Sequence, residues 1–176
     1  MQLLKLLAVV VFMTQSFYNL SIQDTTQQTV SFSSLQGKTV MIVNIATSSD
    51  KVSQLLQLQQ LQTQFADSLV VIGFPSNSFG NENRNDSAIK AFCESAYHTS
   101  FLLATKAPVV GEGIQPVYQW LTTLSENGNM KTPVKTDFQK YIIDKRGSLV
   151  AVFAGSVLPL DSNLVSDLTT IINQPL

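Results

Sequence analysis

The sequence predicts an α/β domain in which a central mixed β-sheet is flanked by helices. Two short runs rich in β-branched and other apolar residues, at 39–45 and 69–74, have the composition of strands that are buried on both faces. Segments with helical periodicity follow these strands along the chain. A hairpin and one further helix are expected at the C-terminal end, which is an order typical of a mixed sheet covered on both sides.

The first half of the domain is expected to begin with a hairpin. Segments 19–23 and 29–32 flank a polar turn, which is the pattern of two paired strands. The first buried strand, 39–45, is followed by a helix expected over 50–65, where leucines recur at helical spacing and glutamines fill the outer face. The second buried strand, 69–74, ends at a proline.

The second half of the domain contains shorter elements. They are, in order, a loop rich in Asn and Ser at 76–86, a helix at 87–97, a short helix at 116–124, a hairpin of strands at 141–144 and 149–153, and a closing helix at 161–172. No internal repeat and no linker interrupts this order, so one domain is expected from 17 to 176.

Composition excludes several functions. The net charge is −1, and no basic stretch is long enough to hold a phosphate backbone, so nucleic-acid binding is not expected. A single cysteine, Cys93, excludes an internal disulfide. One cysteine and one histidine, His98, do not make a zinc ligand set. We expect no cofactor and no metal.

Residues 1–16 have the pattern of a secretory signal peptide. Lys5 precedes an apolar run at 6–13, and Thr14-Gln15-Ser16 follows with residues acceptable for cleavage. The run is too short to span a bilayer, so no stable membrane span is expected. An amphipathic or buried N-terminal segment is the alternative, but the run is apolar on all sides. We expect export to the periplasm or outside, with a mature chain that begins near Phe17.

Particular strings resemble the glutathione peroxidase family. The string VNIATSSD at 43–50 is similar to the family's VNVAS-x-C-G, in which C is cysteine or selenocysteine. GFPSNSFG at 73–80 is similar to GFPCNQFG, and TDFQKYIID at 136–144 is similar to WNFxKFLVD. SFYNL at 16–20 and PVYQWL at 116–121 match other family segments, in family order. The resemblance implies a thioredoxin-like fold of the glutathione peroxidase type.

The resemblance also implies a catalytic tetrad of Cys or selenocysteine, Gln, Trp and Asn. The corresponding positions in this chain are Ser49, Ser78, Thr136 and Asp137, so none of the four side chains is kept. Peroxide reduction needs a thiolate that becomes a sulfenic acid, and a serine hydroxyl has no such counterpart. We therefore expect a degenerate member that does not catalyse the family's reaction and has a binding or structural role.

The replaced site is expected to have become a helix cap. Thr47 with Asp50 three residues later has the capping-box pattern, and Asp50 would place a carboxylate at the positive end of the helix dipole. A hydrolytic site of Ser49, Asp50, Asp137 and His98 is not expected, because nothing places His98 beside Ser49.

The alternative function is a residual thiol peroxidase that acts through Cys93 with glutathione or thioredoxin as reductant, in an oxidative-stress response. Family members that use thioredoxin have a resolving cysteine on this helix, but its partner would be Ser49, which has no sulfur. We expect Cys93 to be a buried apolar residue and Trp120 to lie in the core. The short segment between Trp120 and Phe138 resembles the family's compact members, so a monomer is expected.

Overall fold

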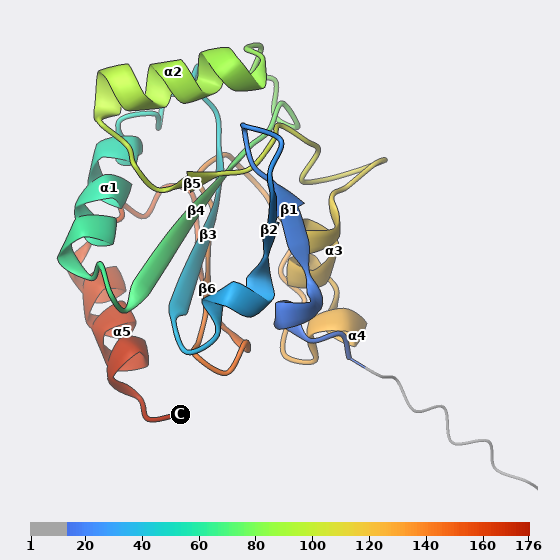
Figure 1. Ribbon diagram of the computed structural model, residues 1–176, viewed down its shortest axis with the longest axis vertical. Helices are drawn as coiled ribbons and strands as arrows, with labels where there is room; N and C mark the ends of the chain where they lie inside the picture. The colour runs from blue at the N-terminus through green and yellow to red at the C-terminus, as the bar shows by residue number, and fades with distance from the viewer. Residues whose placement is uncertain (1–13) are drawn as a thin grey trace, which may run out of the picture.

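The central sheet has five strands in the order β5-β4-β3-β6-β7, in a computed structural model that describes residues 14–176. β3 (Thr39–Ile45) pairs in parallel with β4 (Leu69–Pro75), which pairs in parallel with β5 (Leu102–Leu103). On its other side, β3 is antiparallel to β6 (Lys140–Ile143), which is antiparallel to β7 (Leu149–Phe153). The predicted mixed α/β sheet is confirmed (Figure 1).

Helices and a small hairpin cover the two faces of this sheet. One face packs against α1 (Gln54–Gln64), α2 (Asp86–Tyr97) and α5 (Ser162–Asn173). The other face is covered by the 3-10 helices η1 (Phe17–Asn19) and η2 (Phe32–Leu35), the hairpin of β1 (Ser21–Gln23) and β2 (Thr29–Ser31), and α3 (Pro116–Thr122). The short helix α4 (Leu124–Asn127) follows α3 and contacts it. The predicted N-terminal hairpin is thereby confirmed.

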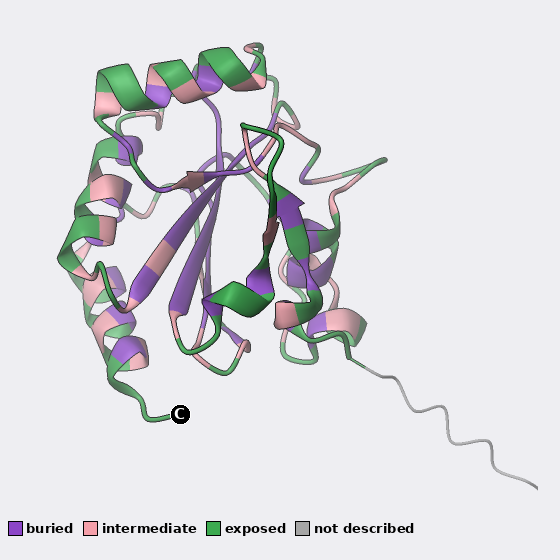
Figure 2. Ribbon diagram, viewed as in Figure 1, coloured by how far each residue is buried: buried purple, intermediate pink, exposed green. Residues whose placement is uncertain are grey.

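Strand β3 shows why the sheet separates two cores. All seven of its residues are buried (Figure 2). Successive side chains of a strand point to opposite faces of the sheet. Val40 and Ile42 belong to the core under η1 and α3, whereas Met41 and Val43 belong to the core under α1, α2 and α5. Its β-branched composition suits this position, which is buried on both faces.

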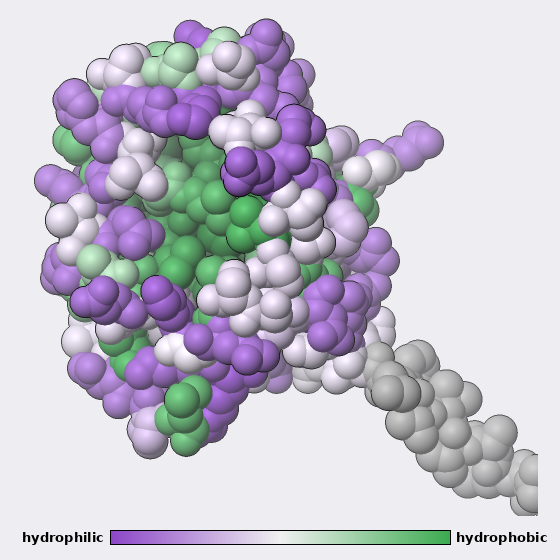
Figure 3. Space-filling model, in the orientation of Figure 1, coloured by the Kyte–Doolittle hydropathy of each residue, from purple (hydrophilic) through white to green (hydrophobic). Residues whose placement is uncertain are grey.

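The edge of the sheet at β4 is only partly paired. Strand β5 covers Ile72 and Gly73, which leaves the beginning of β4 without a neighbouring strand on that side. The Gln62 side chain replaces that neighbour, because its amide donates to the Leu69 carbonyl at 2.9 Å and accepts from the Val71 N–H at 2.8 Å. Figure 3 shows one side of the molecule, where apolar surface gathers in a hollow below α2 and beside the β1–β2 hairpin.

Three expectations about the elements were wrong. The helix expected from residue 50 begins at Gln54, because residues 50–53 form tighter turns with bonds to the third preceding carbonyl. The helix expected over 116–124 is two helices separated at Thr123, whose backbone is extended. Strand β5 was not expected, and its two residues carry no readable alternation.

The signal peptide expected over residues 1–16 lies almost entirely outside the described residues, which begin at Thr14. From residue 14 onward, none of the helices is both long and apolar enough to cross a bilayer.

Candidate functional site

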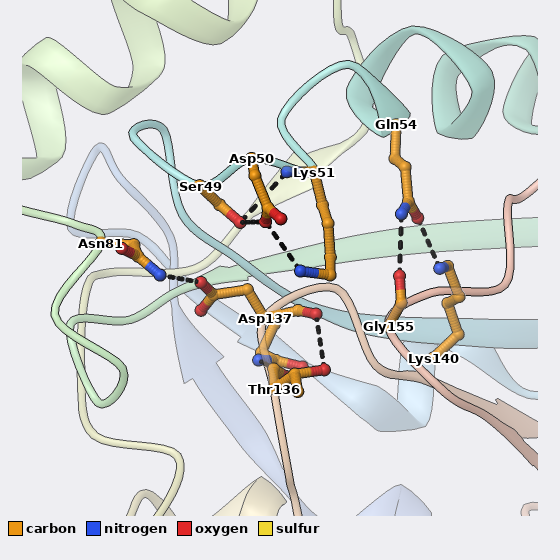
Figure 4. A network of polar contacts seen from close by, with 10 residues as sticks. Ser49, Asp50, Lys51, Gln54, Asn81, Thr136, Asp137, Lys140 and Gly155 are labelled. Carbon is orange, nitrogen blue, oxygen red and sulfur yellow. Dashed lines mark hydrogen bonds and ion pairs between the residues drawn. The ribbon is translucent and has the colours of Figure 1, made fainter.

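Ser49 occupies the turn that follows β3 and precedes α1. Its side chain is buried, with 3% exposed. The Ser49 hydroxyl accepts a hydrogen bond from the Lys51 N–H at 3.3 Å and donates to the Asp50 carboxylate at 3.3 Å (Figure 4). Asp50 also forms an ion pair with the Lys51 ammonium at 2.7 Å, and that hydrogen bond lowers the pKa of Asp50. The Ser49 oxygen, at the position expected for the nucleophile, is therefore bound within a local polar turn.

The expected helix cap is wrong. Helix α1 has Ser53 at its N-cap position with no side-chain capping bond, so neither Thr47 nor Asp50 caps it. The Thr47 N–H and hydroxyl donate instead to the two carboxylate oxygens of Glu82, at 2.6 and 2.8 Å. Asp50 turns outward, with 80% of its side chain exposed. The local sequence pattern assigned Thr47 to a capping box, but its donors bond instead to the buried carboxylate of Glu82, 35 residues away.

Glu82 was missed at the sequence level, because an acidic residue in a polar loop gives no sign of burial. It is completely buried and also accepts from the Arg84 N–H at 3.1 Å. The Arg84 guanidinium donates to the Thr47 hydroxyl at 2.5 Å and lies 4.6 Å from the centre of the Phe92 ring. This network fixes the loop after β4 against the turn after β3.

Ser78, at the position expected for the family's Gln, bonds to a different segment. Its hydroxyl accepts from the Val109 N–H at 3.0 Å and from the Ser76 hydroxyl at 3.0 Å. It lines a cavity of about 350 Å³ together with Lys106 and Glu112. Among its described hydrogen bonds none reaches Ser49, so the shorter side chain closes a loop instead of donating into the site.

Thr136 and Asp137 are held by an unusual backbone turn before β6. Phe138 has a φ of 62°, a left-handed conformation that is rare for a bulky residue and marks a constrained position. The Phe138 N–H donates to the Asn44 carbonyl at 2.7 Å, and the Asn44 side chain donates to the Thr136 carbonyl at 2.9 Å. The Thr136 hydroxyl is used locally, because it donates to the Asp137 carbonyl at 3.1 Å.

Asn81 connects Asp137 to the Ser49 turn. Its side-chain amide donates to the Asp137 carboxylate at 2.6 Å, and its carbonyl accepts from the Ser48 N–H at 3.0 Å. Asp137 is 3% exposed, and its second carboxylate oxygen is buried without a hydrogen-bond partner. Three separate segments therefore meet here (Figure 4). Asn81 was also missed at the sequence level, since it stands among several similar polar loop residues.

Cys93 lies on the inner face of α2 and is completely buried, as expected. Burial raises the pKa of its thiol to about 12, with smaller contributions from Glu82 and Glu94. His98 ends the same helix in a left-handed conformation, with a φ of 53°. No described hydrogen bond joins it to Ser49.

The described residues contain no group of three or more His, Cys, Asp or Glu side chains placed to hold a metal ion.

Trp120 is a core residue as expected, with 1% of it exposed. Its ring lies 5.3 Å from that of Phe17, and its indole N–H donates to the Gln15 carbonyl at 2.7 Å.

Comparison with known proteins identifies the family. A family model described as glutathione peroxidase matches residues 17–122. The chain is 33% identical to the glutathione peroxidase-like peroxiredoxin GPX5 of Chlamydomonas reinhardtii over 159 residues, which cover 89% of this chain and 96% of that protein. It is 30% identical to the glutathione peroxidase homolog BsaA of Bacillus subtilis, over 90% of this chain and 99% of the relative.

Solved structures agree with this relationship. The crystal structure of Trgpx in apo form superimposes with a TM-score of 0.71 at 26% identity, covering 92% of this chain and 97% of the other. T. cruzi GPX1 superimposes with a TM-score of 0.64 at 17% identity, over 90% of this chain and 97% of that chain, a likeness that concerns the fold. The chain belongs to the glutathione peroxidase family of thiol peroxidases and has the family's thioredoxin-like fold.

Proposed function

We propose that this chain is a glutathione peroxidase family member that does not reduce peroxides and that has a binding or structural role as an exported domain. One observation carries the proposal: the position of the nucleophile holds Ser49, an oxygen bound within its own turn. Peroxide reduction requires a thiolate or selenolate that attacks the O–O bond, displaces hydroxide or alkoxide and becomes a sulfenic or selenenic acid. A serine oxygen cannot accept this oxidation.

The other three positions support the same conclusion. Ser78 bonds to the Val109 segment, Thr136 donates to a neighbouring carbonyl, and Asp137 is a carboxylate that, when ionised, only accepts hydrogen bonds. The family's Gln, Trp and Asn would supply donors for a thiolate and a departing hydroxide. A site without preorganised donors loses a large share of transition-state stabilisation.

The alternative, a thiol peroxidase that acts through Cys93, is opposed by the position of that cysteine. A thiol with a pKa of about 12 is ionised in only about one molecule in 10⁵ at neutral pH, and a completely buried sulfur is not accessible to peroxide. Glutathione or thioredoxin would be a partner only under this alternative. The short segment between Trp120 and Phe138 supports a monomer.

The first prediction is that the wild-type protein consumes hydrogen peroxide and organic hydroperoxides no faster than free thiol does, with either glutathione or thioredoxin as reductant. The measurement is a steady-state peroxide-consumption assay. Cys93→Ser is the matched control and is expected to leave the rate at the same background. Turnover that Cys93→Ser abolishes would establish the alternative function.

The second prediction concerns the start of the mature chain. The Gln15 N–H donates to the Glu126 carbonyl at 3.0 Å, and the Gln15 carbonyl accepts from the buried Trp120 indole at 2.7 Å. These bonds support a boundary ahead of Gln15, in place of the expected start near Phe17. A chain that begins at Phe17 leaves the indole donor unpaired and is expected to lose about 1–3 kcal/mol of unfolding free energy relative to one that begins at Thr14.

Two measurements check this boundary. Denaturant unfolding of the two recombinant chains tests the stability difference, and N-terminal sequencing of protein exported by the native host locates the cleavage. If the chains that begin at Thr14 and at Phe17 are equally stable, the bonds of Gln15 give no reason to place the start of the mature chain ahead of Phe17. An intact Met1 in a cytosolic fraction would overturn export itself.

A further inference from the structure

A buried lysine lies where β6, the start of α1 and the loop after β7 meet. Lys140 is completely buried, and its Nζ donates to the Gln54 side-chain oxygen at 2.5 Å and to the Val157 carbonyl at 2.5 Å. Gln54 is 2% exposed, and its amide nitrogen donates to the Gly155 carbonyl at 2.8 Å (Figure 4). Lys140 and Gln54 together therefore hold the 154–161 loop against the first turn of α1.

The acceptors around Lys140 match an uncharged amine. A neutral amine has two N–H groups, and two acceptors are present, both of them neutral. An ammonium has three N–H groups and a full charge, so its third donor would lack an acceptor among the described bonds of this buried side chain. Burial lowers the pKa of Lys140 to about 7, and the positive charge of Lys51 lowers it further.

Among residues 14–176, no carboxylate forms an ion pair with Lys140. The ion pairs found from residue 14 onward are Lys51–Asp50 and Lys90–Glu94. On the side of α1, the nearby charge that acts on Lys140 is the Lys51 ammonium, which is paired with Asp50. Ahead of β6, the Asp137 carboxylate bonds to Asn81. At the end of the 154–161 loop, the Asp161 carboxylate caps α5. Protonation of Lys140 in place would thus bury an unpaired cation.

The loop that Lys140 holds also lies against the family's former Trp and Asn positions. A Cβ added to Gly155 would lie 2.1 Å from the Asp137 carbonyl oxygen and 2.4 Å from the Thr136 hydroxyl. Loosening of the 154–161 loop would therefore uncover the backbone of Thr136 and Asp137. The start of α1 would be released with it, four residues after Asp50.

We propose that Lys140 is a proton-operated latch: its neutral amine fastens the 154–161 loop to the start of α1, and its protonation releases the loop from the former redox site. The proposal does not depend on whether the chain turns over peroxide. It assigns a conformational role to a side chain that does not touch Ser49 in any described contact.

The sign of the pH effect follows from the two protonation states. The pKa of Lys140 is about 7 in the folded chain and about 10.4 in the unfolded chain. Between these values the unfolded chain binds the proton and the folded chain does not, so stability rises with pH through this window. Below about pH 7 both states are protonated and the stabilisation from the neutral latch is absent.

The test follows the lysine and the loop separately, using the wild-type chain. In protein with ¹³C-labelled lysine, the Lys140 Cε resonance is expected to titrate near neutral pH, while exposed lysines titrate near their usual value of about 10.4. Amide hydrogen exchange in the 154–161 loop, corrected for the intrinsic pH dependence, is expected to be about tenfold faster at about pH 6 than at about pH 8.5.

Two variants decide whether the lysine causes the loop effect. Lys140→Met is expected to abolish the pH dependence of loop exchange, whereas Lys135→Met, which removes an exposed lysine five residues earlier, is expected to keep it. If Lys140→Met does not fold, the wild-type titration still decides. A Lys140 resonance that titrates with the exposed lysines, or the same pH dependence in Lys140→Met, would overturn the latch.

Discussion

Returning a sulfur to residue 49 is expected to give only a weak peroxidase, and returning the lost donors with it is expected to raise the peroxide rate about 10²-fold or more. In Ser49→Cys the thiol would lie beside the Asp50 carboxylate, as the hydroxyl does now at 3.3 Å. A neighbouring negative charge disfavours the thiolate, so its pKa should be near or above the ordinary ~8.5.

The substitutions are added in three steps in a Cys93→Ser background, so that the thiol introduced at residue 49 is the one measured. Ser49→Cys comes first, Asp50→Gly and Asp137→Asn follow, and Ser78→Gln with Thr136→Trp completes the set. Thiolate absorbance against pH is expected to show a falling pKa at the second step, and peroxide rates should rise most at the third. Asp67→Asn, which removes an exposed carboxylate beyond the other end of α1, is the control and should change neither quantity. If Ser49→Cys alone titrates well below 8, the carboxylates do not oppose the site.

Gly155→Ala is expected to be the most destabilising small substitution in the domain, with a loss of about 3 kcal/mol of unfolding free energy. Its added Cβ would meet the Asp137 carbonyl oxygen at 2.1 Å, and that oxygen belongs to backbone that cannot rotate away. Gly111→Ala is the matched control, because Gly111 has a φ of 79° and open space around it. The control should cost only about 1 kcal/mol, from the left-handed conformation alone. Equal losses in the two variants by denaturant unfolding would contradict the steric account.

The regular part of the fold could be predicted from local patterns. Both buried strands were placed within one residue of their observed ends, because continuous β-branched runs bounded by a glycine or a proline leave few alternatives. The helices α2 and α5 were also placed within one residue of their observed ends, and each begins after a side chain that caps it, Asn85 for α2 and Asp161 for α5.

The site could be predicted only as a set of positions. Thr47 was assigned to a helix cap, whereas its partner is Glu82, and no local pattern announces a contact across 35 residues. Lys140 was recognised only as part of a family string, because lysines are rarely buried and its partners lie on other elements. The roles of these residues depend on the burial of single polar side chains and on hydrogen bonds between distant segments. No local sequence pattern indicates either.

The central claim, that this chain does not carry out peroxide chemistry, is tested most directly by counting its one thiol before and after treatment with peroxide. The protein is incubated with excess hydrogen peroxide under native conditions, the peroxide is removed, and the thiol is titrated after denaturation, alongside a mass measurement of the proteolytic peptide that contains Cys93. We expect one free thiol per chain and an unchanged mass at Cys93, because that sulfur is buried and its pKa is raised to about 12. Rapid loss of the thiol, with a gain of one oxygen atom at Cys93, would contradict the account and return the chain to the active thiol peroxidases.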